Sequence, residues 1–162
     1  MVYGAINEIG EDWFTQMSKV FDAINDKQTG YNWLITDMDG VPQKVVEHCK
    51  SFNGKCYCWI AGEELSKIVR EDDRQWVWAV LSGFDKSISL SEILRYPHPY
   101  ADGYKGFWRN PLSMQHPLAD VEIVPWDSSL TLFFSRKEEL VKDFLKFFPF
   151  SENLSIYNEK QI

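Results

Sequence analysis

The sequence predicts an α+β fold in a single domain, with helices packed on a mainly antiparallel sheet and a C-terminal β-hairpin followed by a helix. Three observations support this prediction. A chain of 162 residues is long enough for one hydrophobic core. Its 44% hydrophobic and 15% aromatic content is more than a disordered chain carries. Residues 119–148 show the period of two strands and then that of an amphipathic helix.

The hairpin follows from apolar and polar residues that alternate with the period of a strand. Residues 120–125 and residues 130–134 both alternate in this way, and the polar residues 126–129 between them indicate a turn. Pro125 has no N–H to donate to a neighbouring strand. We therefore predict that the first strand of the hairpin lies at an edge of the sheet.

The helix after the hairpin is predicted from its start signal, its period and its end. Ser135 and Glu138 have the spacing of a capping box, in which each side chain accepts a hydrogen bond from the other residue's backbone N–H. Apolar residues then recur at helical spacing over residues 140–148, and Pro149 ends the helix.

At the N-terminus, residues 2–9 indicate a strand and residues 10–25 indicate a helix. The apolar face of this helix contains Trp13, Phe14, Met17, Val20, Phe21 and Ile24. At about 100° per residue, the opposite face is an acidic stripe of Glu11, Asp22 and Asp26, together with Thr15. We expect this stripe to face solvent.

The middle of the chain contains shorter elements with clear boundaries. We predict a loop at 26–30, strands at 31–36 and 55–60, a helix at 63–71, a strand at 74–84, and either irregular structure or a short helix at 41–50. The strand at 74–84 is apolar on both faces, so it belongs in the centre of the sheet. Ser89 and Glu92 form a second capping box, which starts a short helix.

Residues 96–117 have no sustained period and contain four prolines. A connection of this length in a compact domain is either functional or ordered by its own side chains, and the sequence leaves both open. The single globular domain is predicted to span residues 1–150. Residues 151–162 are predicted to form a polar C-terminal tail that frays.

Composition excludes several functional classes. The net charge of −7 argues against a nucleic-acid-binding protein, since phosphate contacts need a basic face. Residues 1–40 contain 7 acidic and 2 basic residues, so most of the excess negative charge lies there. No apolar run approaches the roughly 20 residues that span a bilayer, and no signal peptide is evident, so we predict a cytoplasmic protein without membrane contact. No Gly-rich phosphate loop is present, and no cofactor is predicted.

The segment LITDMDGV at residues 34–41 resembles the first motif of haloacid-dehalogenase-type phosphatases. That resemblance implies that Asp37 attacks phosphorus and Asp39 works as acid and base, next to a bound magnesium ion. Members of the family have a parallel sheet and further motifs that this sequence does not match. The resemblance covers about eight residues. The other interpretation is a strand that ends in an Asx-type turn at Asp39.

Cysteines and histidines offer a second candidate site. Three cysteines, at positions 49, 56 and 58, are an odd number and fit a reducing compartment. Their Cys-x-Cys spacing in a strand is unlike the usual zinc knuckle, so we predict buried thiols and no metal. His98 and His116 lie beside prolines in a loop, without a nucleophile nearby, and are predicted to be structural or surface residues.

In size, charge and predicted fold type, the chain resembles the small acidic immunity proteins of bacterial toxin–immunity systems. The resemblance implies a non-catalytic binding protein that neutralises a basic partner such as a nuclease toxin, whose phosphate-binding surface an acidic protein can mimic. The partner-binding residues would be Glu11, Asp22 and Asp26 in the acidic stripe, with Trp108 and Trp126 as aromatics outside the periodic elements. The alternatives are a small magnesium-dependent phosphohydrolase that uses Asp37 and Asp39, and a regulatory module with another partner.

Overall fold

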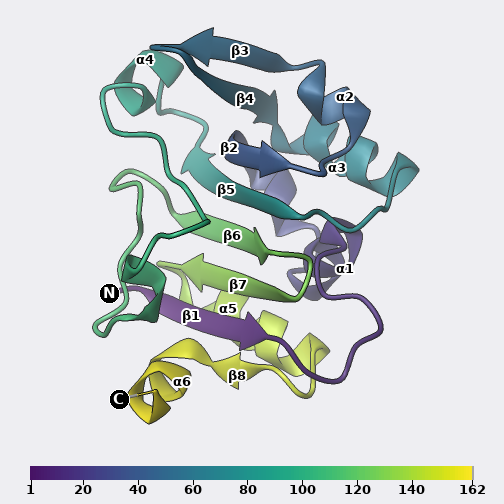
Figure 1. Ribbon diagram of the computed structural model, residues 1–162, viewed down its shortest axis with the longest axis vertical. Coiled ribbons are helices and arrows are strands. Elements are labelled where there is room, and N and C mark those ends of the chain that lie inside the picture. The colour runs from purple at the N-terminus through teal and green to yellow at the C-terminus, as the bar shows by residue number, and fades with distance from the viewer. Residues whose placement is uncertain (162) are drawn as a thin grey trace.

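A computed structural model describes residues 1–161 of the chain. One eight-stranded sheet has the order β3-β4-β2-β5-β6-β7-β1-β8, and its neighbouring strands pair antiparallel (Figure 1). The strands are β1 (Tyr3–Asn7), β2 (Tyr31–Asp39), β3 (Cys49–Phe52), β4 (Lys55–Ala61), β5 (Trp78–Asp85), β6 (Val121–Trp126), β7 (Leu130–Ser135) and β8 (Glu152–Asn153). The predicted single-domain α+β fold with a mainly antiparallel sheet is confirmed.

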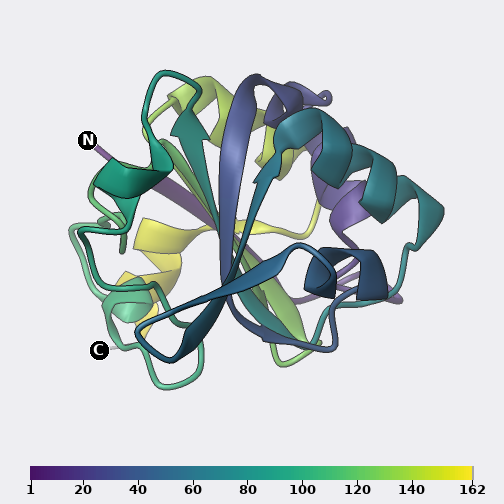
Figure 2. The same ribbon diagram turned by 90° about the horizontal axis from the view of Figure 1, so that it is seen from above.

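Helices cover one face of the sheet and irregular chain covers most of the other. The helices are α1 (Met17–Ala23), α2 (Gln43–Val46), α3 (Gly62–Glu71), α4 (Leu90–Ile93), α5 (Glu138–Phe147) and α6 (Leu154–Lys160), with 3-10 turns η1 (Lys27–Gly30) and η2 (Gly106–Trp108). Figure 2 shows α1, α3 and α5 together on one side of the sheet. We call this the helix face. None of the helices within residues 1–161 is long and apolar enough to cross a membrane.

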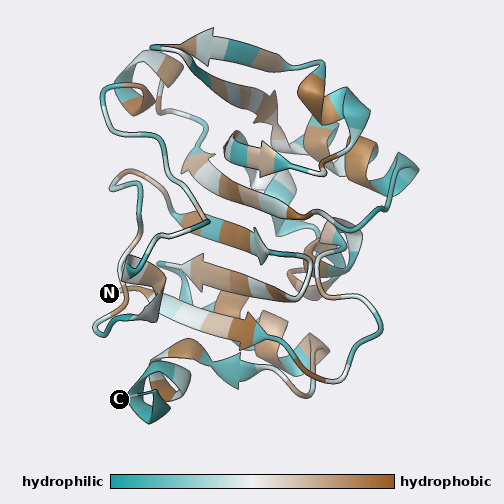
Figure 3. Ribbon diagram, in the orientation of Figure 1, coloured by the Kyte–Doolittle hydropathy of each residue, from teal (hydrophilic) through white to brown (hydrophobic). Residues whose placement is uncertain are grey.

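Alternation along the strands divides the core between the two faces. On β6, Val121 and Ile123 pack under the helices, whereas Val124 packs on the other side with Phe107 and Leu154. Figure 3 shows hydrophobic and polar residues alternating along several strands. The predicted strand period of the hairpin is therefore confirmed.

The hairpin does not lie where Pro125 suggested. β6 is in the interior of the sheet, between β5 and β7. Its register pairs Trp78 with Trp126 and Leu81 with Ile123, and the ladder is interrupted between these two pairs, next to Pro125. The interruption accommodates the missing N–H of Pro125. The predicted edge position is wrong, because β6 has a neighbouring strand on both sides.

One of the two predicted capping boxes is formed. Ser89 Oγ accepts the Glu92 backbone N–H at 3.3 Å, and the Glu92 carboxylate accepts the Ser89 N–H at 3.4 Å. Ser135, in contrast, ends β7, and its hydroxyl accepts the N–H of Lys137, which precedes α5. The hairpin–helix connection is thus two residues longer than the spacing of Ser135 and Glu138 indicated.

The first helix is much shorter than its apolar period predicted. α1 begins at Met17 because the chain before it is bonded to Gln75 and Trp76, which precede β5. The Thr15 hydroxyl donates to the Trp76 carbonyl at 2.7 Å, and the Trp76 N–H donates to the Thr15 carbonyl at 3.0 Å. These bonds compete with a helical turn and bury Thr15. The predicted helical stripe through Glu11 is therefore not present.

Two further segments differ from expectation. The C-terminal segment forms β8, which pairs with β1, and α6, which buries Leu154 completely. Of the predicted tail, only Ile162 lies outside the described residues. Cys49–Phe52 adds an edge strand, β3, which the sequence did not indicate.

We call residues 96–117 the strap, since this segment crosses the face of the sheet opposite the helices. It is held by bonds between side chains and backbone. Thr36 donates to the Pro99 carbonyl at 2.7 Å, Glu122 accepts the Gln115 N–H at 2.6 Å, and His116 bonds the Ile93 carbonyl at 3.0 Å. We call the face under the strap, α4 and α6 the strap face. The strap is ordered even though it contains only one 3-10 turn, η2.

Candidate functional site

A fork between two strands creates a hollow on the sheet. β2 pairs with β4 as far as Thr36 and Tyr57, and with β5 from Tyr31 to Asp39. The β2–β5 register shifts between Thr36 and Asp39, and Asp37 there adopts the left-handed conformation with φ of 53°. A bulge of this kind bends a strand. Beyond it, β2 and β4 no longer pair with each other.

The fork encloses a pocket of about 620 Å³. We call it the fork pocket. Its lining comes from β2 and the residues after it, from α2, β3 and β4, and from the strap: Thr36, Asp37, Met38, Asp39, Gly40, Val41, Val46, Cys49, Lys55, Cys56, His98, Pro99 and Tyr100. This volume lies within the usual range of roughly 300–1,000 Å³ for small-molecule sites. The pocket brings together the motif at 34–41 and the strap, which the sequence identified separately.

The two aspartates of the motif differ in their surroundings. The Asp37 carboxylate accepts the backbone N–H of Ala101 at 2.8 Å and that of Asp102 at 3.4 Å. Asp37 therefore fixes the strap to β2. Asp39 is exposed and has no hydrogen bond or ion pair from its side chain within residues 1–161. Of these two aspartates, Asp39 is the one whose carboxylate makes no bond within residues 1–161 and can therefore bind a ligand with both oxygens.

The opposite wall of the fork pocket contains Lys55 and His98. Both residues also line a neighbouring hollow of about 270 Å³, so they separate the two spaces. The His98 ring packs edge-on against Tyr57, with 5.7 Å between ring centroids, and its buried Nε2 has no hydrogen-bond partner within the described residues. Burial lowers the pKa of His98, and the nearby charge of Lys55 lowers it further. His98 is therefore neutral at pH 7.

Two of the three thiols line the same pocket. Cys49 and Cys56 line it, and the buried Cys58 lies opposite Cys49 in the β3–β4 register. Burial is the main cause that raises the pKa of Cys49, and also that of Cys58, to about 12. Among residues 1–161, no group of three or more His, Cys, Asp and Glu side chains is placed to hold a metal ion.

A buried carboxyl group, Glu122, was not singled out from the sequence. It is completely buried on β6 beneath the strap, and burial raises its pKa to about 8. One of its oxygens accepts the Gln115 N–H, while Oε2 has no partner within residues 1–161. Glu122 alternates with Val121 and Ile123, and in a half-buried strand this alternation predicts that Glu122 faces solvent. The only signal in the sequence for the burial of Glu122 was the apolar residue Val124, which lies on the same side of the strand.

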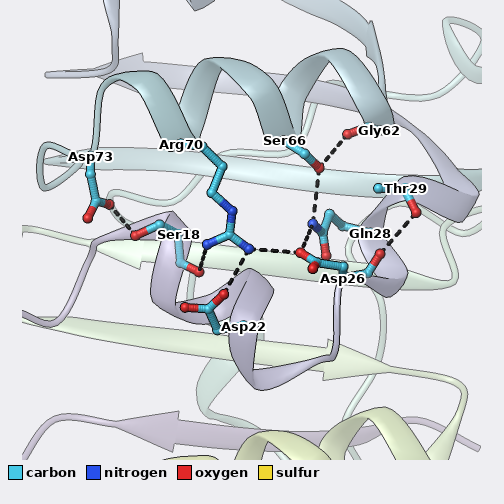
Figure 4. A network of polar contacts seen from close by, with 9 residues as sticks. All are labelled: Ser18, Asp22, Asp26, Gln28, Thr29, Gly62, Ser66, Arg70 and Asp73. Carbon is cyan, nitrogen blue, oxygen red and sulfur yellow. Dashed lines mark hydrogen bonds and ion pairs between the residues drawn. The ribbon is translucent and has the colours of Figure 1, made fainter.

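The predicted acidic residues Asp22 and Asp26 are held in a polar network between α1 and α3 (Figure 4). Arg70 Nη2 is 2.8 Å from Asp22 Oδ1 and 2.8 Å from Asp26 Oδ1. Arg70 also donates to the Ser18 carbonyl at 3.0 Å. One cation thus offsets the charge of two of the three acidic residues that the sequence suggested for partner binding.

The predicted aromatic residues lie on the other face. Trp108 and Trp126 are half-buried and pack together at 5.3 Å between ring centroids, in the strap-face cluster that contains Phe107. Asp22 and Asp26, in contrast, lie on the helix face. The structure therefore does not gather the predicted acidic and aromatic residues into one surface, and Trp13, at 55% exposure, is more exposed than either tryptophan.

Four exposed apolar side chains lie on the acidic loop that precedes α1 and at or just after the end of α5. We call them the apolar patch: Ile9 and Trp13 on the loop, and Phe147 and Phe150 at the end of α5 and after it, which are 62%, 55%, 46% and 66% exposed. A Cβ on Gly10 would collide with the Phe150 ring, so the loop and the chain after α5 are in close contact. The same loop carries Glu8, Glu11 and Asp12. The loop thus carries both exposed apolar side chains and negative charge, and it contacts the chain after α5.

Comparisons with known proteins do not add a family assignment. No family model matches the chain, and no curated protein or solved structure matches it either.

Proposed function

We propose that this protein is a non-catalytic binding protein of the bacterial cytoplasm that neutralises a basic toxin, as immunity proteins do. The observation that carries the proposal is the apolar patch beside an acidic loop. Large exposed apolar clusters on a protein surface commonly mark interaction sites. Acidic residues at the rim complement a basic partner and speed the encounter with it.

The proposal assigns different tasks to the two kinds of residue. Glu11, with Asp12 beside it, steers the partner, because rim charges act mainly on the association rate. Trp13 supplies buried contact, as tryptophan does at many binding hot spots. Asp22 and Asp26 contribute less, since Arg70 offsets their charge. Trp108 and Trp126 on the strap face would serve a second contact.

The test requires a candidate toxin, taken from the adjacent gene or recovered from the native host, and binding kinetics at two salt concentrations. We expect the double variant Glu11→Lys, Asp12→Lys to associate more slowly with a weaker salt dependence, because these charges are screened beyond about 8 Å at physiological salt. We expect Trp13→Ala to dissociate faster, at a cost of about 2 kcal/mol in binding free energy.

Matched controls separate this surface from the rest of the molecule. Glu159→Lys and Ile156→Ala change exposed residues on α6, outside the apolar patch, and both should bind as the parent does. An acidic partner would contradict the proposal, and so would unchanged association of the charge-reversed variant at low salt. If no basic partner is recovered, a regulatory module with another partner becomes the better proposal.

A second candidate function is a magnesium-dependent phosphohydrolase that uses Asp37 and Asp39. The observation in its favour is that both carboxylates line the fork pocket. We expect the purified protein not to hydrolyse a generic phosphate ester in the presence of magnesium. Robust turnover that disappears in Asp37→Asn and in Asp39→Asn would replace the binding proposal with the enzymatic one.

A further inference from the structure

The charged groups of the fork pocket lie on separate strands. Asp37 and Asp39 belong to β2, whereas Lys55 begins β4. β2 and β4 diverge after Thr36, and within residues 1–161 neither Asp39 nor Lys55 is part of an ion pair. The fork pocket therefore has a negative wall on β2 and a positive wall on β4, with no ion pair between them in the described chain.

Neutral groups fill the space between these walls. Met38, Val41 and Val46 provide apolar surface, and the His98 ring, whose Nε2 is buried, also belongs to the lining. A ligand with only a positive charge would be repelled by Lys55, and one with only a negative charge would meet two carboxylates. The lining therefore favours a ligand with one charge of each sign and a short apolar body.

The backbone at the fork adds a further means of recognition. After the pair of Thr36 and Tyr57, the edges of β2 and β4 that face each other no longer form a ladder. Strand edges bind the amide groups of extended ligands through main-chain hydrogen bonds. An amide between the two charges of a ligand would match this arrangement.

We propose that the fork pocket binds a small zwitterion of the amino-acid or short-peptide class, with the ligand's ammonium group at Asp39 and its carboxylate at Lys55. This site is separate from the apolar patch, and it does not depend on the proposed function. Asp37 plays a positioning role, since its carboxylate holds the strap that forms one side of the pocket.

The experiment is an NMR titration of the labelled full chain that follows the backbone amides. The probes are L-leucine and alanyl-leucine, with isopentylamine and 4-methylpentanoate as analogues of leucine that lack the carboxylate or the ammonium group. We expect at least one zwitterion to shift the amides of Gly40, Cys56 and Tyr100. It should bind about tenfold more tightly than either analogue, which corresponds to about 1.4 kcal/mol.

Variants test the two charged contacts. Asp39→Asn and Lys55→Met alter exposed side chains without intramolecular bonds in the described chain, so both should fold, and thermal unfolding checks this. We expect each to weaken binding of the zwitterion about tenfold, whereas Glu159→Gln on α6 should leave it unchanged. The proposal is overturned if neither zwitterion shifts these amides at up to about 10 mM, a concentration that reveals even millimolar affinities. It is also overturned if a singly charged analogue binds as tightly, or if both variants bind as the parent does.

Discussion

The two faces of the sheet are covered in different ways, and the difference explains what this protein can offer a ligand. On the helix face, α1, α3 and α5 present apolar side chains at helical spacing and cover the core, with a polar hollow of about 460 Å³ between η1 and the start of α5. On the strap face, an irregular segment is fixed by individual bonds from Thr36, Asp37 and Glu122. Helices cover a face through their repeating apolar pattern, whereas the strap covers it through single hydrogen bonds, and the fork pocket lies at the margin of the strap.

The largest expected effect is the loss of stability when a core aromatic side chain is removed, and it can be compared between the two faces. Phe144 stacks on Phe133 under α5, and Phe107 packs against Phe134 under the strap. We expect Phe144→Ala to lower the free energy of unfolding by about 4 kcal/mol, and Phe107→Ala by about 3 kcal/mol, because the strap can relax into the cavity more easily than a helix. Denaturant unfolding measures both. A loss below about 1 kcal/mol for Phe107→Ala would mean that the strap is not part of the cooperative core.

The pH dependence of stability should come from the strap face. Burial raises the pKa of Glu122 in the folded protein to about 8, from an ordinary value of 4.5. The folded state therefore binds the Glu122 proton more tightly than the unfolded state does. The stability that this proton contributes is complete below the pKa of Glu122 in the unfolded state, and it is lost as pH rises towards the pKa in the folded state. We expect stability to fall between about pH 4.5 and 8, by at most about 1.4 kcal/mol per pH unit.

The variant Glu122→Gln isolates this contribution, because a neutral amide keeps the shape of the protonated carboxyl group without titrating. We expect its unfolding free energy to change less with pH than that of the parent, and to exceed that of the parent above pH 8. Chemical unfolding at several pH values from 4 to 9 provides the measurement. Parallel pH profiles for the two proteins would show that Glu122 is not the responsible group.

A smaller effect distinguishes the two aspartates of the fork pocket. Asp37→Ala removes the acceptor of two backbone N–H groups of the strap, and we expect it to cost about 2 kcal/mol of stability. Asp39→Ala removes no intramolecular bond within residues 1–161, and we expect a change of no more than about 0.5 kcal/mol. Thermal unfolding of the two variants compares them directly. Equal losses would contradict the structural role assigned to Asp37.

The smallest effect concerns a local contact on the strap face. Ser89 and Glu92 form the capping box of α4, and Ser89→Ala should cost about 1 kcal/mol. Hydrogen exchange of the α4 amides should rise in the variant while exchange in α5 stays as in the parent. If α5 exchanges faster as well, the helix and strap faces are more tightly coupled than their separate cores indicate.

Local patterns were sufficient for much of the scaffold. The β6–β7 hairpin, β4, β5, α3 and α5 each carry their own period over several residues, and their positions follow from it. The same approach identified Asp37 and Asp39 as a pair, and residues 96–117 as an unusual segment. These features share one property: the residues that define each of them are neighbours in the sequence.

Tertiary pairing decided the remainder, because it joins residues that are distant in the chain. Asp37, Lys55 and His98 form one pocket only because β2 separates from β4 at a bulge and the strap returns to it. The period of residues 10–25 favoured a long helix, but bonds between Thr15 and Trp76 delay its start until Met17. Glu122 is buried by a loop that carries no pattern of its own. The sequence by itself determined which residues share a face of an element, and only the tertiary structure decided what covers that face, since burial and pairing depend on contacts that local periodicity does not encode.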